Sequence, residues 1–427
     1  MTAVGSRRRI VVTGLGAVTA IGQSVPELWA SLRAGTCGIR QIERFYQNCP
    51  HFLTPSSING YQLAASLGAQ IESFDQRQRL QHIKRDKLIQ LADRFSLFAA
   101  TAAREAMEQA GLAHPLPNPY RTACIIGSAI AGVINVEAAY RHIFELKNPA
   151  SHPMTLLRAV GSSPAAHVSI EYGIKGPVFG VCSTCTSGLN ALSVASSYIR
   201  QGLVDIALAG AADAPHAYGA MRIWEAAGLL STEGLFPFAQ SRSGTVLGEG
   251  AGLLVLEELD HARTRRATPL AELCAIGIGA SATDMSTPDP EGSAAAMISA
   301  LRGAGLEPDD IDYVNAHGIG TKEHDLVETE AMRQVFGARL REVAVSGTKS
   351  MYGNVLGASG SIEAAICIKA ISEGWVPPTA GGRPIDPRFD LDLVVGAGRS
   401  LPMRYAMSNA FGLMGLNASV IFGPPPE

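Results

Sequence analysis

The stretch of sequence that decides the fold is Gly176-Pro-Val-Phe-Gly-Val-Cys-Ser-Thr-Cys185-Thr-Ser-Gly-Leu-Asn-Ala-Leu192. It begins as a short strand, turns sharply in a segment rich in Ser, Thr and Cys, and enters a helix over 187–199 that carries no charge. A helix that is small or apolar on every side is buried in the middle of a protein. We therefore expect a central helix, with Cys185 at or just before its first turn.

A second segment repeats this layout further along the chain. The helix expected over 360–371 carries only Glu363 and Lys369, and it follows a Gly-rich turn after a strand. Glycines stop both helices, at Gly202 and Gly374. The repeat predicts two similar halves, each with one buried helix.

Strand-like runs alternate with helical runs from end to end, which predicts an α/β fold built in layers. We assign residues 8–259 to an N-terminal half that carries the cysteine and residues 269–424 to a C-terminal half, joined by the polar stretch 260–269. Amphipathic helices are expected over 95–109 and 294–301. The expected strands cover residues 10–13, 123–127, 178–181, 204–209, 252–256, 311–315, 343–346, 393–396 and 418–422.

The bulk composition favours a large globular protein. The chain has 427 residues, 47% of them hydrophobic, and a formal net charge of −3. This weak charge gives no electrostatic support for a nucleic-acid partner or an anionic membrane surface. A basic run at 77–87 is interpreted as a solvated helix face in preference to a docking patch for an acidic partner.

The first residues imitate a secretory signal, because three arginines precede the apolar segment 10–22. That segment is interrupted by Thr13, Gly14, Gly16 and Thr19, so we interpret it as a first strand and a turn. No later apolar run is long enough to span a bilayer. The expectation is a cytoplasmic protein without a membrane partner.

Seven cysteines without paired spacing, in a chain too large to need stapling, indicate reduced thiols. Cys182 and Cys185 form a Cys-x-x-Cys that could be half of a zinc site or a redox pair. No second pair accompanies them in the sequence, so no metal is expected. Gly14-Leu-Gly16 resembles a dinucleotide loop but lacks the third glycine and a well-placed acid, so no bound cofactor is expected.

The position of Cys185 at the start of a helix makes it a candidate nucleophile. Free amides and the positive end of the helix dipole stabilise a thiolate there, and the same amides can hold an oxyanion. A buried cysteine alone is more often inert packing, so partners are needed. His317 follows the strand at 311–315 in a Gly-rich turn, and Asn354 follows the strand at 343–346. Strand ends related by the internal repeat would bring the three side chains together, where a histidine can polarise a carbonyl or move a proton.

Several short motifs follow one another along the chain. They are Val12-Thr-Gly-Leu-Gly16, Ser183-Thr-Cys-Thr-Ser-Gly188, Pro237-Phe238 with Arg242, Gly248-Glu-Gly-Ala-Gly252, His317-Gly-x-x-Thr321, Lys349-Ser-Met351, Pro377-Pro-Thr379 and Ser408-Asn-Ala-Phe-Gly412. In this order they resemble the β-ketoacyl-acyl-carrier-protein synthases, elongating branch, of the thiolase-like superfamily. The resemblance covers the chain from about Arg8 to Phe422.

The resemblance implies a layered α-β-α-β-α fold made of two similar halves with buried central helices. It also implies a dimer, formed with itself or with a related ketosynthase-like subunit. Substrates would arrive on the phosphopantetheine of an acyl carrier protein, and no cofactor would be bound.

The resemblance also assigns roles residue by residue. Cys185 would be the acylated nucleophile, and His317 and Asn354 would hold the malonyl carbonyl. Phe411 would be a gatekeeper whose backbone amide forms the oxyanion hole together with that of Cys185. The other positions assigned are, for the gate and substrate binding, Thr184, Ile130, Thr321, Gly412, Leu413 and Met414, and, for support behind the site, Lys349 and Glu328.

This sequence departs from the family pattern at several positions. Asn354 stands where the elongating pattern has its second histidine. Ile319 replaces one of two threonines at the pantetheine arm and leaves Thr321, while His324 nearby is expected at the surface of the turn. The gate reads Gly412-Leu413-Met414-Gly415-Leu416-Asn417, where the family pattern is Gly-Phe-Gly-Gly-Thr-Asn. Ala239 and Ser243 replace two aspartates of the family pattern.

The function implied is decarboxylative Claisen condensation of an acyl group on Cys185 with malonyl carrier protein, in fatty acid or polyketide synthesis. A Cys-His-Asn set resembles the initiating branch of the superfamily, so Asn354 is compatible with condensation. One alternative is an acyltransferase of the same fold that does not elongate, and another is a non-catalytic chain-length partner in a ketosynthase heterodimer. Cys185 argues against the second, because such partners lack the nucleophile. Thr184 adds bulk beside the thiol, and Met414 and Leu416 add bulk near the gate, which favours a restricted acyl pocket.

Overall fold

Eleven strands form one hydrogen-bonded sheet in the computed structural model, in the order β12-β10-β9-β14-β15-β8-β1-β7-β6-β4-β5. The structure describes residues 8–42, 63–71, 74, 92–112, 115–144, 147 and 153–426. The strands of this sheet are β1 (Ile10–Val18), β4 (Thr122–Gly127), β5 (Val178–Phe179), β6 (Ile206–Asp213), β7 (Gly250–Glu258), β8 (Ala271–Ala280), β9 (Tyr313–Asn315), β10 (Ala344–Ser346), β12 (Asp392–Leu393), β14 (Ala406–Gly412) and β15 (Leu416–Gly423).

The α-helices and the remaining short strands complete the described chain. The helices are α1 (Val25–Ala34), α4 (Arg94–Gln109), α5 (Val133–Phe144), α6 (Thr155–Ala159), α7 (Ser163–Tyr172), α8 (Ser187–Arg200), α9 (Tyr218–Ala226), α10 (Leu259–Thr264), α11 (Pro290–Ala304), α12 (Lys322–Phe336), α13 (Lys349–Tyr352) and α14 (Ser359–Glu373). The short strands pair as β2 (Arg40–Gln41) with β3 (Leu67–Gly68), and as β11 (Trp375–Val376) with β13 (Arg399–Ser400).

The two halves of the large sheet have the same topology. In chain order the first half contributes β1, β4, β5, β6 and β7, and the second contributes β8, β9, β10, β14 and β15, with β12 added at the edge beside β10. In each set the spatial order is third, second, fourth, fifth, first. β1 and β8 join the halves by antiparallel pairing of Val11 with Glu272 and of Val12 with Ala271. The prediction of two similar halves is confirmed.

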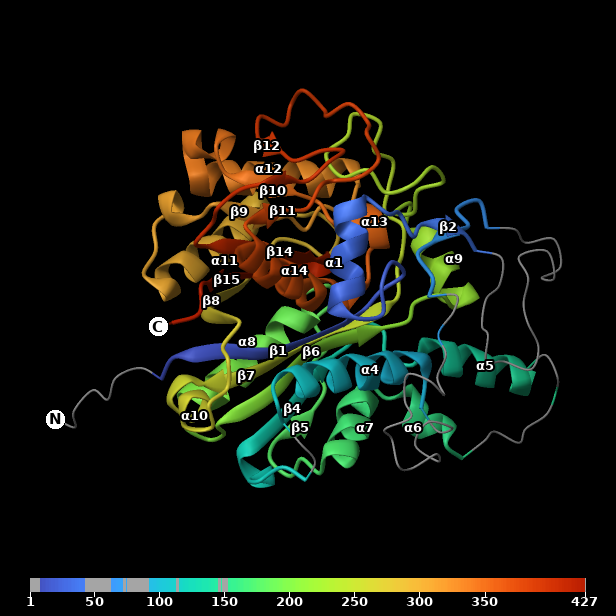
Figure 1. Ribbon diagram of the computed structural model, residues 1–427. Helices are drawn as coiled ribbons and strands as arrows, with labels where there is room; N and C mark the ends of the chain where they lie inside the picture. Colours follow the sequence, from blue (N-terminus) through green and yellow to red (C-terminus); the bar gives the residue numbers. More distant parts are fainter. Residues whose placement is uncertain are drawn as a thin grey trace.

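Helices cover the sheet and fill the space between its two halves (Figure 1). α4 and α7 pack apolar residues outside the first half, and α11 and α12 do so outside the second. α8 and α14 lie in the central layer, whose core also contains residues from both halves of the sheet. This succession of layers is the α-β-α-β-α fold that the family resemblance implies.

The two central helices approach each other closely at their N-terminal ends. A Cβ built on Gly188 in α8 would lie 2.9 Å from the carbonyl oxygen of Gly357, just before α14. A Cβ built on Gly360 in α14 would lie 2.8 Å from Leu189 Cγ. Only glycine fits so close an approach. The segments that precede the two helices, which carry the candidate thiol and the candidate amide, are therefore held side by side.

Most predicted elements are present, usually with wider bounds. α8 and α14 are the two buried helices, and α4 and α11 contain the two amphipathic ones. The turn expected after Thr13 was wrong, because a β-bulge between Val12 and Gly14 lets β1 continue to Val18. β8 and β14 were not predicted, and the polar stretch expected to join the halves contains α10.

The glycines of β1 serve packing. A Cβ built on Gly14 would lie 1.9 Å from Ala106 O, and one built on Gly16 would lie 1.9 Å from Ala102 O. Both carbonyls belong to α4, so the glycines let this helix lie directly on the strand.

The irregular segment before α4 is described only in part. Its residues 63–71 return to the body of the protein, where Ala69 N donates to Leu247 O (2.9 Å). The basic run predicted at 77–87 lies outside the described residues. Among the residues that are described, no helix is both long and apolar enough to cross a membrane.

Gly16→Ala is expected to lower the free energy of unfolding by about 1–3 kcal/mol, because the added methyl group overpacks the contact between β1 and α4. Gly279→Ala is the matched control. Gly279 also lies in a strand, β8, but the nearest neighbour of an added Cβ is 3.9 Å away. Urea denaturation measures both variants, and equal losses of stability would contradict this packing account.

Candidate active site

Cys185 lies in a tight turn directly before Thr186, the N-cap of α8. Thr184 precedes it with a positive φ of 51°. The carbonyl oxygen of Thr184 accepts hydrogen bonds from Ser187 N (3.2 Å) and Ser187 Oγ (2.7 Å). The Cys185 side chain is buried. The turn therefore places the thiol inside the protein at the start of a buried helix.

Burial dominates the electrostatics of this thiol. It raises the pKa of Cys185 to about 12; the Lys349 ammonium opposes this shift, whereas Asp213 and Glu363 add to it. The expectation of a stabilised thiolate was therefore wrong for the resting protein, because desolvation outweighs the favourable charges. The shift in pKa favours the neutral thiol at rest.

His317 follows β9, and two buried charged side chains hold its backbone. Glu328 in α12 accepts hydrogen bonds from His317 N (2.7 Å) and Gly318 N (2.8 Å). Lys349 Nζ donates to His317 O (2.6 Å) and to Glu363 Oε1 (2.5 Å). Both side chains therefore position His317 through its main chain.

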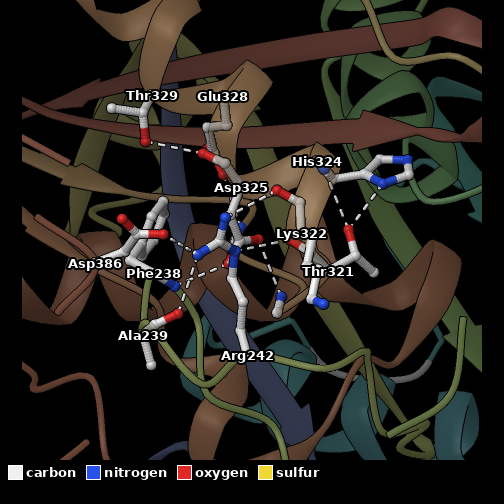
Figure 2. Close-up of polar contacts among 12 residues, drawn as sticks. Phe238, Ala239, Arg242, Thr321, Lys322, His324, Asp325, Glu328, Thr329 and Asp386 are labelled. Carbon is white, nitrogen blue, oxygen red and sulfur yellow. Dashed lines mark hydrogen bonds and ion pairs between the residues drawn. The ribbon is translucent and has the colours of Figure 1, made fainter. Parts of the chain in front are cut away.

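The remainder of the His317 turn is clamped by Asp325 and Arg242 (Figure 2). Asp325 accepts hydrogen bonds from Gly320 N (3.0 Å) and Phe238 N (2.8 Å). Arg242 donates to two carbonyl oxygens at the start of α12 and to Asp386 Oδ2 (2.8 Å). Asp386 is thus the nearest carboxylate of Arg242, since Asp325 lies 4.0 Å away.

His324 was expected at the surface, and that expectation was wrong. Its half-buried ring places Nδ1 2.9 Å from Thr321 Oγ1, which also accepts a hydrogen bond from His324 N (3.2 Å), as Figure 2 shows. The N-cap hydroxyl of Thr321 holds the ring against the start of α12. The hydroxyl expected at the pantetheine arm therefore already has two partners in the protein.

The His317 ring is neutral and unpaired. Burial lowers the pKa of His317 well below its ordinary value, and the Lys349 ammonium lowers it further. Among the described residues neither Nδ1 nor Nε2 of this ring has a hydrogen-bond partner, although both atoms are buried. A neutral imidazole keeps one N–H. The ring therefore holds an unused donor.

Asn354 presents a second unused donor. Its Oδ1 accepts hydrogen bonds from Leu356 N (3.1 Å) and Ser359 Oγ (3.3 Å). These contacts orient the amide, and its buried Nδ2 has no partner within the described part of the chain. Gly357, three residues on, lies against Ser187, with 3.0 Å between an added Cβ and Ser187 Cβ. Asn354 therefore lies close to the turn that carries Cys185.

Phe411 and Gly412 connect the thiol to the imidazole. The Phe411 ring packs edge-on against the His317 ring with 6.2 Å between the centroids. A Cβ built on Gly412 would lie 2.0 Å from Thr184 Oγ1 and 3.3 Å from Cys185 N. The end of β14 therefore lies against the His317 ring and against the backbone of the turn that carries Cys185. Beyond it, Leu413 is partly exposed and Met414 is exposed.

Asp213, at the end of β6, is a residue of this site that the sequence analysis missed. Its carboxylate accepts hydrogen bonds from Ser128 Oγ (2.6 Å), Ile130 N (3.3 Å) and Gly357 N (2.8 Å). It therefore ties the loop of Ile130, a predicted substrate-binding residue, to the turn after Asn354. The available signal was a single carboxylate closing an otherwise apolar strand.

Cys182 and Cys185, the Cys-x-x-Cys of the sequence, form no disulfide. Cys182 and Cys185 are both free, one exposed and the other buried. In the described ranges no group of three or more His, Cys, Asp or Glu side chains could hold a metal ion.

The doubled α/β fold, with a thiol at one buried helix and unpaired donors beside the other, defines the thiolase-like class. The chain belongs to the beta-ketoacyl synthase family, since the models of its N-terminal and C-terminal domains match residues 7–262 and 270–383. Membership places it broadly among acyltransferase-type enzymes.

Individual relatives extend along nearly the whole chain. Nodulation protein E of Rhizobium sp. (strain N33) is 40% identical over 415 residues, covering 97% of this chain and 99% of that protein. The 3-oxoacyl-[acyl-carrier-protein] synthase 2 of Coxiella burnetii (strain RSA 493 / Nine Mile phase I) is 34% identical over 423 residues, covering 97% and 98%. The ishigamide ketosynthase/chain length factor structure superimposes with a TM-score of 0.89 at 29% identity, covering 99% and 100% of the two chains.

The pKa of about 12 predicts how Cys185 reacts with iodoacetamide, since the thiolate is the nucleophile. The alkylation rate at Cys185 is expected to rise about tenfold per pH unit from about pH 7 to about pH 10, because the thiolate fraction grows in that proportion below the pKa. Timed quenching followed by peptide mass spectrometry measures the alkylation of Cys185 separately from that of the other cysteines. A rate that levels off below about pH 8 would show that the resting group is a thiolate.

Proposed function

We propose that this protein is a ketosynthase that holds an acyl group on Cys185 and extends it by two carbons taken from a malonyl thioester. The observation that carries the proposal is the pair of buried, unpaired donors on His317 and Asn354. Phe411 and Gly412 link the first donor to the turn of the buried Cys185, and the contact of Gly357 with Ser187 links the second donor to that turn. Buried polar groups without partners are costly in a folded protein. A substrate oxygen that binds both groups would supply the missing partner.

In the first half-reaction the sulfur of Cys185 attacks the carbonyl carbon of an acyl thioester. The new C–S bond forms as the bond to the carrier sulfur breaks, and the proton of Cys185 leaves with the carrier thiol. The backbone amides of Cys185 and Phe411 are proposed to hold the tetrahedral oxygen. Loss of one such donor costs about 3 kcal/mol in an enzyme, so the contact between β14 and the Cys185 turn is central to this step.

In the second half-reaction the malonyl carbonyl binds between His317 and Asn354. Loss of carbon dioxide leaves an enolate, whose oxygen needs hydrogen-bond donors rather than a base. The neutral imidazole supplies one N–H, and Asn354 Nδ2 supplies another at every pH. The enolate carbon then attacks the acyl-cysteine, the C–S bond breaks, and the departing thiolate of Cys185 takes a proton from water.

Other residues act through these groups. Glu328 and Lys349 are proposed to hold His317 in position, because both form hydrogen bonds with its main chain. Asp213 is proposed to hold the Asn354 turn against the loop of Ile130. No step requires a bound cofactor.

The substrates are proposed to arrive on the phosphopantetheine of an acyl carrier protein, and the protein to act as a dimer with itself or with a related subunit. The name of the Coxiella relative specifies an acyl carrier protein, and the ishigamide structure pairs a ketosynthase with a chain length factor. Those names support both parts of the proposal.

Acyl transfer without elongation is the competing function. It is motivated by the departures from the elongating pattern at Ile319, at Asn354 and at residues 413–416. Mass spectrometry of products formed from acyl and malonyl carrier proteins decides between the two. A β-keto chain longer by two carbons supports condensation, whereas an acyl chain moved unchanged to a new acceptor supports transfer.

His317→Ala is expected to abolish decarboxylation of malonyl carrier protein while acylation of Cys185 survives, because only the enolate needs the imidazole N–H. Intact-mass analysis follows the acyl adduct, and carbon dioxide release follows decarboxylation. Equal loss of both half-reactions would refute this division of labour.

Asn354→Leu is expected to slow condensation by about 100-fold or more, the cost of losing one donor to a developing oxyanion. Asn354→His, which restores an N–H at that position, is the matched variant and is expected to retain more activity than Asn354→Leu. Steady-state kcat with malonyl carrier protein measures both. Equal activity of the two variants would show that the donor at 354 has no part in the reaction.

A further inference from the structure

Thr184 holds an unusual backbone conformation beside the nucleophile. Its φ of 51° lies in the left-handed region, which β-branched residues rarely enter. Hydrogen bonds from Ser187 N and Ser187 Oγ to the Thr184 carbonyl keep it there. Strained residues that the surrounding structure over-determines cluster at functional sites. The strained conformation therefore makes Thr184 a candidate functional residue.

The Thr184 side chain occupies the space beside Gly412. A Cβ built on Gly412 would lie 2.0 Å from Thr184 Oγ1 and 3.2 Å from Thr184 Cβ. The hydroxyl oxygen is buried and has no hydrogen-bond partner among the described residues. The contact between the Thr184 side chain and Gly412 is therefore one of van der Waals packing. It fills the space in which a side chain at position 412 would lie.

The segment 411–415, which we call the gate segment, is restrained at its other end as well. Gly415 O accepts hydrogen bonds from Ser281 N (2.8 Å) and Asn417 Nδ2 (3.0 Å). Between the two ends Met414 has a φ of 66°, and its side chain is 46% exposed. The gate segment is thus fixed at both ends and strained in the middle, and Phe411 within it covers His317.

We propose that Thr184 is a specificity-determining residue that latches the gate segment against the nucleophile turn and limits which acyl chains reach Cys185. The segment cannot move toward Cys185 past the Thr184 side chain, and it moves away only by giving up this contact. Chains that are long or broad beyond the thioester need that movement, whereas small groups do not. This inference rests on the proposed function, since it specifies the substrates of the same site.

Size-graded alkylation of Cys185 tests the latch directly. Iodoacetamide serves as the small probe and an N-dodecyl iodoacetamide as the long one, with the modification of Cys185 measured by peptide mass spectrometry. Thr184→Ala is expected to raise the rate ratio of long to short probe by about tenfold, the change expected when one strained contact is released. Thr184→Val keeps the branched shape without the hydroxyl and is expected to retain the wild-type ratio.

Two outcomes would overturn the proposal. One is an unchanged ratio in Thr184→Ala, and the other is a Thr184→Val ratio equal to that of Thr184→Ala, which would assign the effect to the hydroxyl.

The same experiment separates the latch from the reaction. Alkylation needs neither a carrier protein nor malonyl substrate, so its result stands whether or not the protein condenses acyl chains. Thermal unfolding of the variants provides the folding control, and Thr184→Ala is expected to be no less stable than wild type because it removes a branched residue from a left-handed conformation.

Discussion

The close approach of α8 and α14 at their first turns is the contact on which the candidate site depends. Gly188 and Gly360 allow it, because a side chain at either position would meet the other helix or the turn before it. Each helix is preceded by a turn that carries a candidate catalytic side chain, Cys185 before α8 and Asn354 before α14. The distance between the helices therefore sets the distance between those turns. Packing thus positions the two turns, because the small, apolar surfaces of the two helices are enclosed between the halves of one sheet.

Burial sets the electrostatic state of the site. It raises the pKa of Cys185 and lowers that of His317, so both groups are neutral at rest. Lys349, whose Nζ donates to His317 O and to Glu363, is the nearby charge that lowers both pKa values. A neutral imidazole and a neutral amide are suited to stabilising an enolate oxygen, because each keeps an N–H that can donate a hydrogen bond.

The sequence predicted the parts of the fold that follow from a strong local pattern. The charge-free run at 187–199 can only be an interior helix, and its counterpart at 360–371 indicated the second half. β8 and β14 were missed because their sequences are rich in alanine, glycine and small polar residues, which carry little strand signal. Their assignment depends on pairing with partners far away in the chain.

The site was less predictable than the fold, for reasons of tertiary structure. Asp213 becomes relevant only because Gly357, 144 residues later, donates to it. His324 follows the surface pattern of its helix, yet a local hydrogen bond to Thr321 turns the ring inward. The helix-start rule indicated a thiolate at Cys185, whereas the cost of desolvation, which depends on everything packed around the thiol, decides its state.

A crystal structure with a pantetheine-linked malonyl analogue that cannot lose carbon dioxide tests the central claim most directly. The account predicts that the analogue's carbonyl oxygen lies about 3 Å from a ring nitrogen of His317 and from Asn354 Nδ2, which are the two unpaired donors of the site. A bound analogue whose carbonyl lies elsewhere, with both donors still unpaired, would contradict it.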